Sequence, residues 1–154
     1  MGTANGYEHA WYLTAALRPE QARLAVERVI RRIRRMDSVD AIAFRGMSGA
    51  LIAPAVSIRL GIPLIMVRKE AKTHSAHSVE GYALAKRYVI VDDLVASGKT
   101  VIAICEAIEG FAPDARCAGV ITYNTARPTK DDIRNDNASV PVRLRSACEG
   151  MESE

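Results

Sequence analysis

The stretch YVIVDDLVASGKT, Tyr88 to Thr100, decides the fold of this chain. Residues 88–91 have the composition of a buried strand, and two carboxylates, Asp92 and Asp93, follow at its end. A loop of small residues then leads into a helix that begins near Lys99. The hydroxyls of a ribose can donate hydrogen bonds to a carboxylate pair, and such a loop offers backbone N–H groups and a helix N-terminus to a phosphate. The stretch therefore predicts a binding site for a phosphorylated ribose.

The ending Gly98-Lys99-Thr100 also resembles the end of a nucleotide-binding P-loop. That motif needs a glycine five residues before its second glycine, and this position is Asp93. A carboxylate there would face the phosphates, so the sequence argues against an ATP-type P-loop. A buried strand whose end is merely solvated by aspartate explains either carboxylate alone. It does not explain the pair, the loop and the helix together.

The bulk composition limits the class of protein. A chain of 154 residues, 49% hydrophobic and 25% charged, predicts a single domain spanning residues 1–154. Its net charge of +3 suits an anionic substrate and is too small to predict a nucleic-acid partner. Three cysteines without metal-type spacing, Cys105, Cys117 and Cys148, predict reduced thiols and a cytoplasmic location. No apolar run approaches the length that spans a bilayer, so we expect no membrane partner.

Strand and helix patterns alternate along the chain. We expect strands over 41–44, 62–67, 88–91, 116–123 and 140–144, and helices over 18–36, 50–60 and 99–109. Nearly continuous apolar strands between helices predict an α/β fold, a Rossmann-like parallel sheet flanked by helices. Ligands bind such sheets at the carboxyl ends of the strands. The segments 45–49, 68–86 and 92–100 are therefore expected to form one site.

The first predicted helix has an apolar and a basic face. The apolar stripe comprises Leu24, Val26, Val29, Ile30, Ile33 and Met36. The basic face comprises Arg28, Arg31, Arg32, Arg34 and Arg35. We interpret the arginines as a solvated face, and contact with RNA or phosphate is the alternative.

Residues 88–100 resemble the signature of type I phosphoribosyltransferases, which is four apolar residues, two acidic residues and then a small-residue loop. The resemblance to this family covers roughly residues 39–123. These enzymes displace pyrophosphate from C1 of phosphoribosyl pyrophosphate (PRPP) with a ring nitrogen of a nucleobase. The resemblance implies that PRPP and a nucleobase are the partners and that Mg²⁺ is the cofactor, held mainly through water and PRPP with Asp92 and Asp93 as protein ligands. It implies that the ribose diol and 5′-phosphate contact Asp92, Asp93, Ala96, Ser97, Gly98, Lys99 and Thr100.

The turn after the first predicted strand resembles the pyrophosphate loop of this family. It comprises Arg45, Gly46, Met47, Ser48 and Gly49. Glycines let a backbone approach a diphosphate closely, and an arginine adds positive charge. The resemblance also implies a strained, cis non-proline peptide in this turn. As a pattern alone, an ordinary strand-to-helix turn has the same appearance.

The segment Arg68-Lys69-Glu70-Ala71-Lys72-Thr73-His74 resembles the flexible catalytic loop of orotate phosphoribosyltransferases. Carried over by position, the catalytic candidates are Arg68, Lys69, Lys72 and His74. Three fixed cations and an imidazole can neutralise or protonate a departing pyrophosphate. In the orotate enzymes this loop reaches the site of a neighbouring subunit, which implies a homodimer. His74 and His77 have no third ligand nearby, so we expect no metal between them.

The sequence does not determine which nucleobase is the substrate. The resemblance implies a small hood built from residues 1–17 and the C-terminal tail, where Tyr7, Trp11 or Tyr12 can stack on a base and Arg127 can meet a carboxylate. Packing against the core and simple surface exposure are the ordinary roles of such residues. Ala96 replaces an aspartate of the hypoxanthine-guanine enzymes, which argues against a 6-oxopurine, whereas adenine enzymes share that alanine.

Three hypotheses follow from the sequence. The first is a phosphoribosyltransferase for an orotate-like pyrimidine, and the second is an adenine-type purine salvage enzyme. The third is a non-catalytic, nucleotide-sensing regulator with the same fold, which keeps the nucleotide site and binds RNA, DNA or another partner. The cations of the 68–74 segment favour catalysis, because a sensor need not retain Lys72 and His74.

Overall fold

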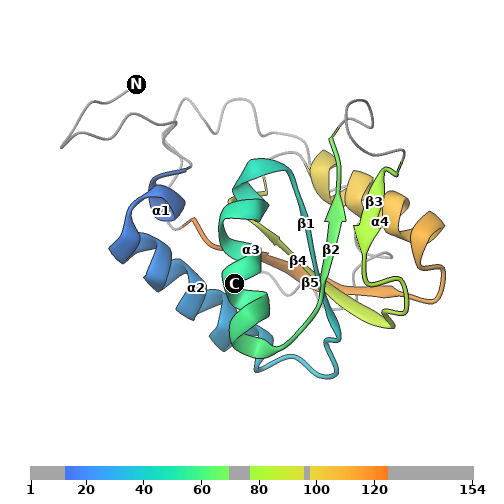
Figure 1. Cartoon of the computed structure of the whole chain (residues 1–154), viewed down its shortest axis with the longest axis horizontal. Coiled ribbons are helices and arrows are strands. Elements are labelled where there is room, and N and C mark those ends of the chain that lie inside the picture. Colours follow the sequence, from blue (N-terminus) through green and yellow to red (C-terminus); the bar gives the residue numbers. More distant parts are fainter. Residues whose placement is uncertain (1–12, 70–76, 96–97, 125–154) are drawn as a thin grey trace.

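The structure is a computed structural model that describes residues 13–69, 77–95 and 98–124 (Figure 1). The described part of the chain contains one five-stranded sheet of order β3-β2-β1-β4-β5. The strands are β1 (Ala41–Arg45), β2 (Leu64–Val67), β3 (Val79–Gly81), β4 (Arg87–Asp92) and β5 (Arg116–Thr122). The helices are α1 (Thr14–Leu17), α2 (Pro19–Ile33), α3 (Gly46–Leu60) and α4 (Lys99–Phe111).

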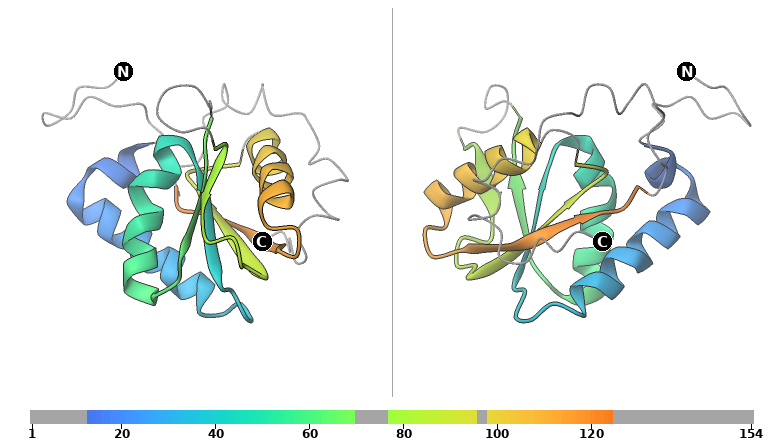
Figure 2. Two further views of the ribbon diagram at one scale, coloured as in Figure 1. Left: turned by 45° about the vertical axis from the view of Figure 1, so that its right-hand side comes forward. Right: turned by 180° about the vertical axis from the view of Figure 1, so that it is seen from behind.

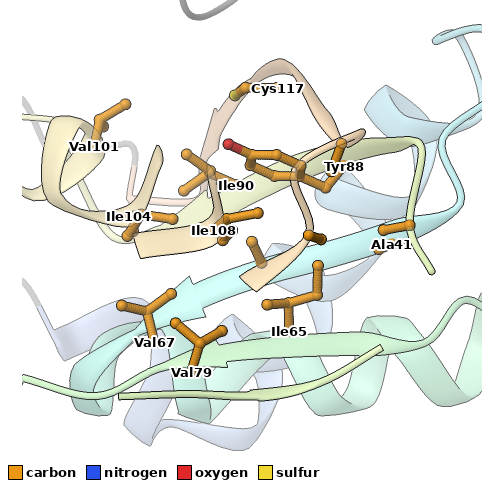
Figure 3. Packing of buried hydrophobic residues seen from close by; sticks show 14 residues of the cluster. Ala41, Ile65, Val67, Val79, Tyr88, Ile90, Val101, Ile104, Ile108 and Cys117 are labelled. Carbon is orange, nitrogen blue, oxygen red and sulfur yellow. The ribbon is translucent and has the colours of Figure 1, made fainter. Parts of the chain in front are cut away.

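Helices cover both faces of the sheet, as the alternating pattern predicts. Helices α2 and α3 pack on one face and α4 on the other, which the edge-on view in Figure 2 shows clearly. Each face has its own buried cluster. On the α4 side, Ile104 and Ile108 point toward Ile65 and Ile90 of the sheet (Figure 3). On the other side, the apolar residues of α2 and α3 meet the opposite side chains of β1 and β4.

The edge of the sheet differs from the prediction. Strands β2, β1, β4 and β5 are parallel, but β3 pairs antiparallel to β2, with Val67 opposite Val79. The predicted parallel sheet flanked by helices is confirmed, and the antiparallel edge strand β3 is an addition that was not predicted. A three-residue strand with one buried apolar side chain, Val79, carries too short a pattern to be recognised.

The helix ends also differ from the predictions. Pro19 occupies the first turn of α2 as expected, but the helix ends at Ile33 rather than Met36, because the chain closes into a tight turn in which Met36 N–H bonds Ile33 C=O. Leu24, assigned to the apolar stripe, is 49% exposed. Helix α4 continues through Gly110, which was expected to stop it.

The predicted turn over residues 45–49 is replaced by a direct junction. Strand β1 includes Arg45 and α3 begins at Gly46, which has a left-handed φ of 71°. This glycine turns the chain from strand to helix within one residue, so no separate loop is needed. No cis peptide bond occurs in the described residues, which corrects the expectation of one here.

The topology places a ligand site between β1 and β4. The chain leaves β1 through α3 on one face to reach β2, and it leaves β4 through α4 on the other face to reach β5. The order of strands thus reverses between β1 and β4, and a crevice opens there at the carboxyl ends of both strands.

Candidate functional site

A cavity of about 300 Å³ lies at the carboxyl ends of β1 and β4. Residues from all three segments singled out in the sequence surround it, so the expectation that these segments open on one edge is confirmed. The lining residues are Arg45, Ser48, Lys69, Asp92, Asp93, Leu94, Val95, Gly98, Thr100 and Val101.

A pair of buried carboxylates forms part of the wall of this cavity. Asp92 and Asp93 are 6% and 9% exposed, and they are the only charged residues classed as buried in the described part of the chain. Asp92 Oδ1 accepts hydrogen bonds from Ser48 Oγ at 3.0 Å and from the Asp93 N–H at 2.9 Å. Asp93 Oδ1 accepts one from the Leu94 N–H at 2.8 Å. The Oδ1 atoms of both carboxylates are thus held by hydrogen bonds from within the site.

Burial changes the acidity of the first of these carboxyl groups. Desolvation raises the pKa of Asp92 to about 6, assisted by its hydrogen bond with the Asp93 side chain and opposed by the Asp93 N–H and the Ser48 hydroxyl. The negative charge of the neighbouring Asp93 also raises the pKa of Asp92. At neutral pH Asp92 is still mostly ionised and can accept hydrogen bonds from a diol.

Positive charge lies at the opposite wall of the cavity. A Cβ added at Gly46 would lie 2.6 Å from Lys69 Cε, so the Lys69 side chain lies directly across the first residue of α3. Arg45 Nε is buried and has no hydrogen-bond partner among the described residues. A helix N-terminus, a lysine and an arginine with an unused N–H together suit an anion.

A second helix begins at the same cavity. Gly98 is buried with a left-handed φ of 73° and caps α4, and its carbonyl accepts a hydrogen bond from the Ile102 N–H at 3.0 Å. Thr100 in the first turn lines the cavity, whereas Lys99 is exposed and is not among the lining residues. The start of α4 therefore offers backbone N–H groups and the Thr100 hydroxyl to a phosphate.

Arg68 is placed differently from its neighbour Lys69. Its guanidinium forms an ion pair with Glu80 of β3, with Nη2 and Oε2 2.6 Å apart. It lines a second cavity of about 600 Å³, which also includes Leu13, Phe44, Met47 and Met66. This second cavity shares Ser48 and Lys69 with the first, whereas Arg68 lines only the second.

Several predicted site residues lie outside the described residues. These are Ala96, Ser97, Lys72, His74, Tyr7, Trp11, Tyr12 and Arg127. Within the described residues, no group of three or more histidine, cysteine or acidic side chains is arranged to hold a metal ion. No helix in the described ranges has the length and apolar character needed to cross a membrane.

The structure adds residues that sequence reasoning missed. Leu94, Val95 and Val101 line the cavity, and their position inside or beside the 88–100 stretch was a usable signal. Tyr123 was missed without any signal. It follows β5, far along the chain from the motif, yet its hydroxyl donates a hydrogen bond to the Ser48 carbonyl at 2.8 Å.

Comparison with known proteins shows the family to which the fold and the sequence are similar. A family model described as "Phosphoribosyl transferase domain" matches residues 17–146. The "HGPRTase-like protein 1" of Haloquadratum walsbyi is 32% identical over 144 residues, which cover 84% of this chain and 75% of that protein. The protein of the same name from Haloarcula marismortui is 30% identical over 116 residues, covering 66% of this chain and 64% of that protein. The matches span 60% to 65% of the length of the first three curated relatives.

Solved structures share the fold. A UMP synthase from Leishmania donovani has a TM-score of 0.55 at 28% identity, covering 68% of this chain and 22% of that chain. An orotate phosphoribosyltransferase from Francisella tularensis has a TM-score of 0.61 at 16% identity, covering 84% and 63%. An adenine phosphoribosyltransferase from Leishmania tarentolae has a TM-score of 0.57 at 22% identity, covering 70% and 59%.

Proposed function

The chain belongs to the phosphoribosyl transferase family, and on that premise we propose that it transfers the ribose 5-phosphate of PRPP to a nucleobase with release of pyrophosphate. One observation carries the proposal. A single cavity brings together a buried carboxylate pair, two helix N-termini and the cations Arg45 and Lys69. PRPP has a matching sequence of groups, with a diol between two phosphate-bearing ends.

Each part of PRPP has a corresponding wall in this cavity. The ribose hydroxyls donate to the carboxylates of Asp92 and Asp93, which line the cavity. The 5′-phosphate binds at the start of α4, where Gly98 allows close approach and Thr100 supplies a hydroxyl. The pyrophosphate lies at the start of α3, beside Lys69.

The chemistry needs stabilisation of charge at the pyrophosphate end. The bond from C1 to the pyrophosphate oxygen breaks, the bond from C1 to the base nitrogen forms, and the pyrophosphate leaves with the electron pair. Arg45 and Lys69 are positioned to neutralise that departing charge. We assign the same role to Lys72, to His74, which can also donate a proton, and to Arg68, whose guanidinium is paired with Glu80 in the structure.

The donor set fits Mg²⁺ held mainly by water and substrate. Asp92 and Asp93 present hard carboxylate oxygens at the cavity, and two such ligands suffice when PRPP oxygens supply others. When bound, Mg²⁺ neutralises charge on the pyrophosphate oxygens.

For the base, we propose an orotate-like pyrimidine. The 68–74 segment supports this choice, and so does the 28% identity with a protein named UMP synthase. Tyr7, Tyr12 and Arg127 are the proposed base contacts. A purine is the second candidate. It is favoured by the name "HGPRTase-like protein 1" of the relatives from Haloarcula marismortui and Haloquadratum walsbyi and, for adenine, by Ala96.

The test is pyrophosphate release from PRPP and Mg²⁺ with a panel of bases comprising orotate, uracil, adenine, hypoxanthine, guanine, xanthine and nicotinate. We expect turnover with orotate. Turnover with a purine alone would support the proposed reaction and would show that the base is a purine rather than orotate. PRPP binding without turnover on any base would favour the non-catalytic regulator.

A further inference from the structure

We infer that Tyr123 is a positioning residue that holds the two halves of the PRPP site at a fixed separation. The inference rests on the proposed function, because it concerns the pyrophosphate end and the ribose end of that same site. Tyr123 contacts neither half of the proposed ligand, and it acts through Ser48 and Asp92.

The three residues form a closed ring of hydrogen bonds. The Tyr123 hydroxyl donates to the Ser48 carbonyl at 2.8 Å, and the Ser48 hydroxyl donates to Asp92 Oδ1 at 3.0 Å. The ring closes through the Tyr123 N–H, which donates to the Asp92 carbonyl at 3.1 Å. Its members come from three elements, namely the end of β5, the first turn of α3 and the end of β4.

Tyr123 is itself rigidly held. Its side chain is fully buried, among the apolar residues beneath α2 and α3. Its carbonyl accepts a hydrogen bond from Arg28 Nη1 of α2 at 3.0 Å. The hydroxyl of a tyrosine is a hydrogen-bond donor at neutral pH, and here it donates to the Ser48 carbonyl.

This ring spans the boundary between the two halves of the site. Ser48 belongs to the turn proposed to bind pyrophosphate, and Asp92 belongs to the pair proposed to bind the ribose. Sheet pairing does not restrain the start of α3 relative to the end of β4, because the helix leaves the sheet at Gly46. The hydrogen bond from Ser48 to Asp92 restrains it directly, and the hydroxyl of Tyr123 adds a second restraint by holding the Ser48 backbone. A ligand that bridges both halves benefits from it, and a ligand that occupies one half does not.

The variant Tyr123→Phe distinguishes the positioning role of the hydroxyl from the packing role of the side chain in the core. The variant keeps the aromatic ring that packs in the core and removes only the hydroxyl. The matched control is Tyr88→Phe, a tyrosine that is 3% exposed in the cluster on the opposite face of the sheet. Calorimetry on the full chain with Mg²⁺ measures three ligands, namely PRPP, inorganic pyrophosphate and ribose 5-phosphate.

We expect Tyr123→Phe to weaken PRPP binding about tenfold, while the affinities for pyrophosphate and ribose 5-phosphate change less than about twofold. Tyr88→Phe is expected to leave all three unchanged. Unchanged PRPP affinity in Tyr123→Phe, or an equal loss for all three ligands, would overturn the inference. A wild-type protein that binds none of them would overturn the proposed function itself, and this inference with it.

A second variant keeps the test decisive if Tyr123→Phe does not fold. Arg28→Met removes the hydrogen bond to the Tyr123 carbonyl from the surface of α2 and leaves the core intact. Its matched control is Arg32→Met, an exposed arginine on the same helix. Arg28→Met should reproduce the selective loss of PRPP affinity at smaller amplitude. Equal behaviour of the two arginine variants would count against the role of Tyr123.

Discussion

Asp92 is the residue in which burial and function compete. The residue is 6% exposed, so ionisation of its carboxyl costs more in the folded protein than in water. The hydrogen bonds from Ser48 and from the Asp93 N–H offset part of that cost. A carboxylate that remains buried and under-solvated gains most when a ligand donates hydrogen bonds to it, as a ribose diol would.

The raised pKa of Asp92 predicts how stability depends on pH. The pKa is about 6 in the folded state and near 4 in the unfolded chain, so the folded state holds the proton more tightly. The stabilising contribution of the protonated group is complete below pH 4 and is lost as the pH rises through 6. Relative to Asp92→Asn, the wild type should therefore lose about 2 to 3 kcal/mol of unfolding free energy between pH 4 and pH 7.

Urea denaturation of both proteins across this range measures that difference. Asp114→Asn serves as the control, since Asp114 is exposed and its pKa is lowered by its bond to Lys86. If the unfolding free energy of the wild type relative to Asp92→Asn stays constant or rises between pH 4 and pH 7, the fold does not raise the pKa of Asp92.

At the scale of elements, the first turn of α3 determines whether the site can form. A Cβ added at Gly49 would lie 2.6 Å from Phe44 Cβ and 3.1 Å from the Val91 carbonyl oxygen. The glycine therefore lets the helix approach both β1 and the end of β4. This close approach is what brings Ser48 within hydrogen-bond distance of Asp92.

Gly49→Ala is predicted to destabilise the protein by about 1 to 3 kcal/mol, despite the higher helix propensity of alanine. Gly110→Ala in α4 is the matched control, because nothing lies within 4 Å of a Cβ added there. That variant should gain about 0.5 to 1 kcal/mol. Thermal unfolding of both reports the contrast, and similar shifts in the two variants would contradict the packing argument.

The elements with long patterns were predictable, and those set by single contacts were not. Strands β1 and β4 follow from their continuous apolar runs, and the crevice between them follows from the alternation of strands and helices. The direct junction at Gly46 was not predictable, because the sequence of a turn and that of a helix start are alike. The ion pair of Arg68 with Glu80 depends on β3, which was itself too short to recognise.

The residues of the site also divide into those that a local pattern predicts and those that it does not. The acidic pair and the helix start at Gly98 were identified from one contiguous stretch. Tyr123 reaches Ser48 only because β5 lies beside β4 and both end near α3. Such a contact joins residues far apart in the chain, and no local pattern encodes it.

At the scale of the whole molecule, α3 presents an apolar outer face. Met47, Leu51, Pro54 and Ile58 follow helical spacing on the side away from the sheet, and Met47 and Ile58 are 69% and 83% exposed. A helix that is apolar on both faces is usually covered by a partner. We propose that a second copy of this chain covers it, which agrees with the homodimer that the 68–74 segment implies.

Ile58→Asp is expected to convert the proposed dimer into monomers, because it places a charge in the apolar face. Leu84→Asp is the control, since Leu84 is 73% exposed but lies before β4 and outside α3. Sedimentation equilibrium of the wild type and both variants measures the mass in solution. A monomeric wild type, or a dimer that survives Ile58→Asp, would contradict this assembly.

The central claim is that the carboxylates of Asp92 and Asp93 bind the ribose of PRPP, and calorimetric titration with PRPP and Mg²⁺ tests it most directly. We predict that the wild type binds and that the double variant Asp92→Asn with Asp93→Asn loses at least about a hundredfold in affinity, because the diol loses both charged acceptors. The exposed Asp114→Asn variant should bind as the wild type does. Undiminished affinity in a correctly folded double variant would contradict the assignment of the site.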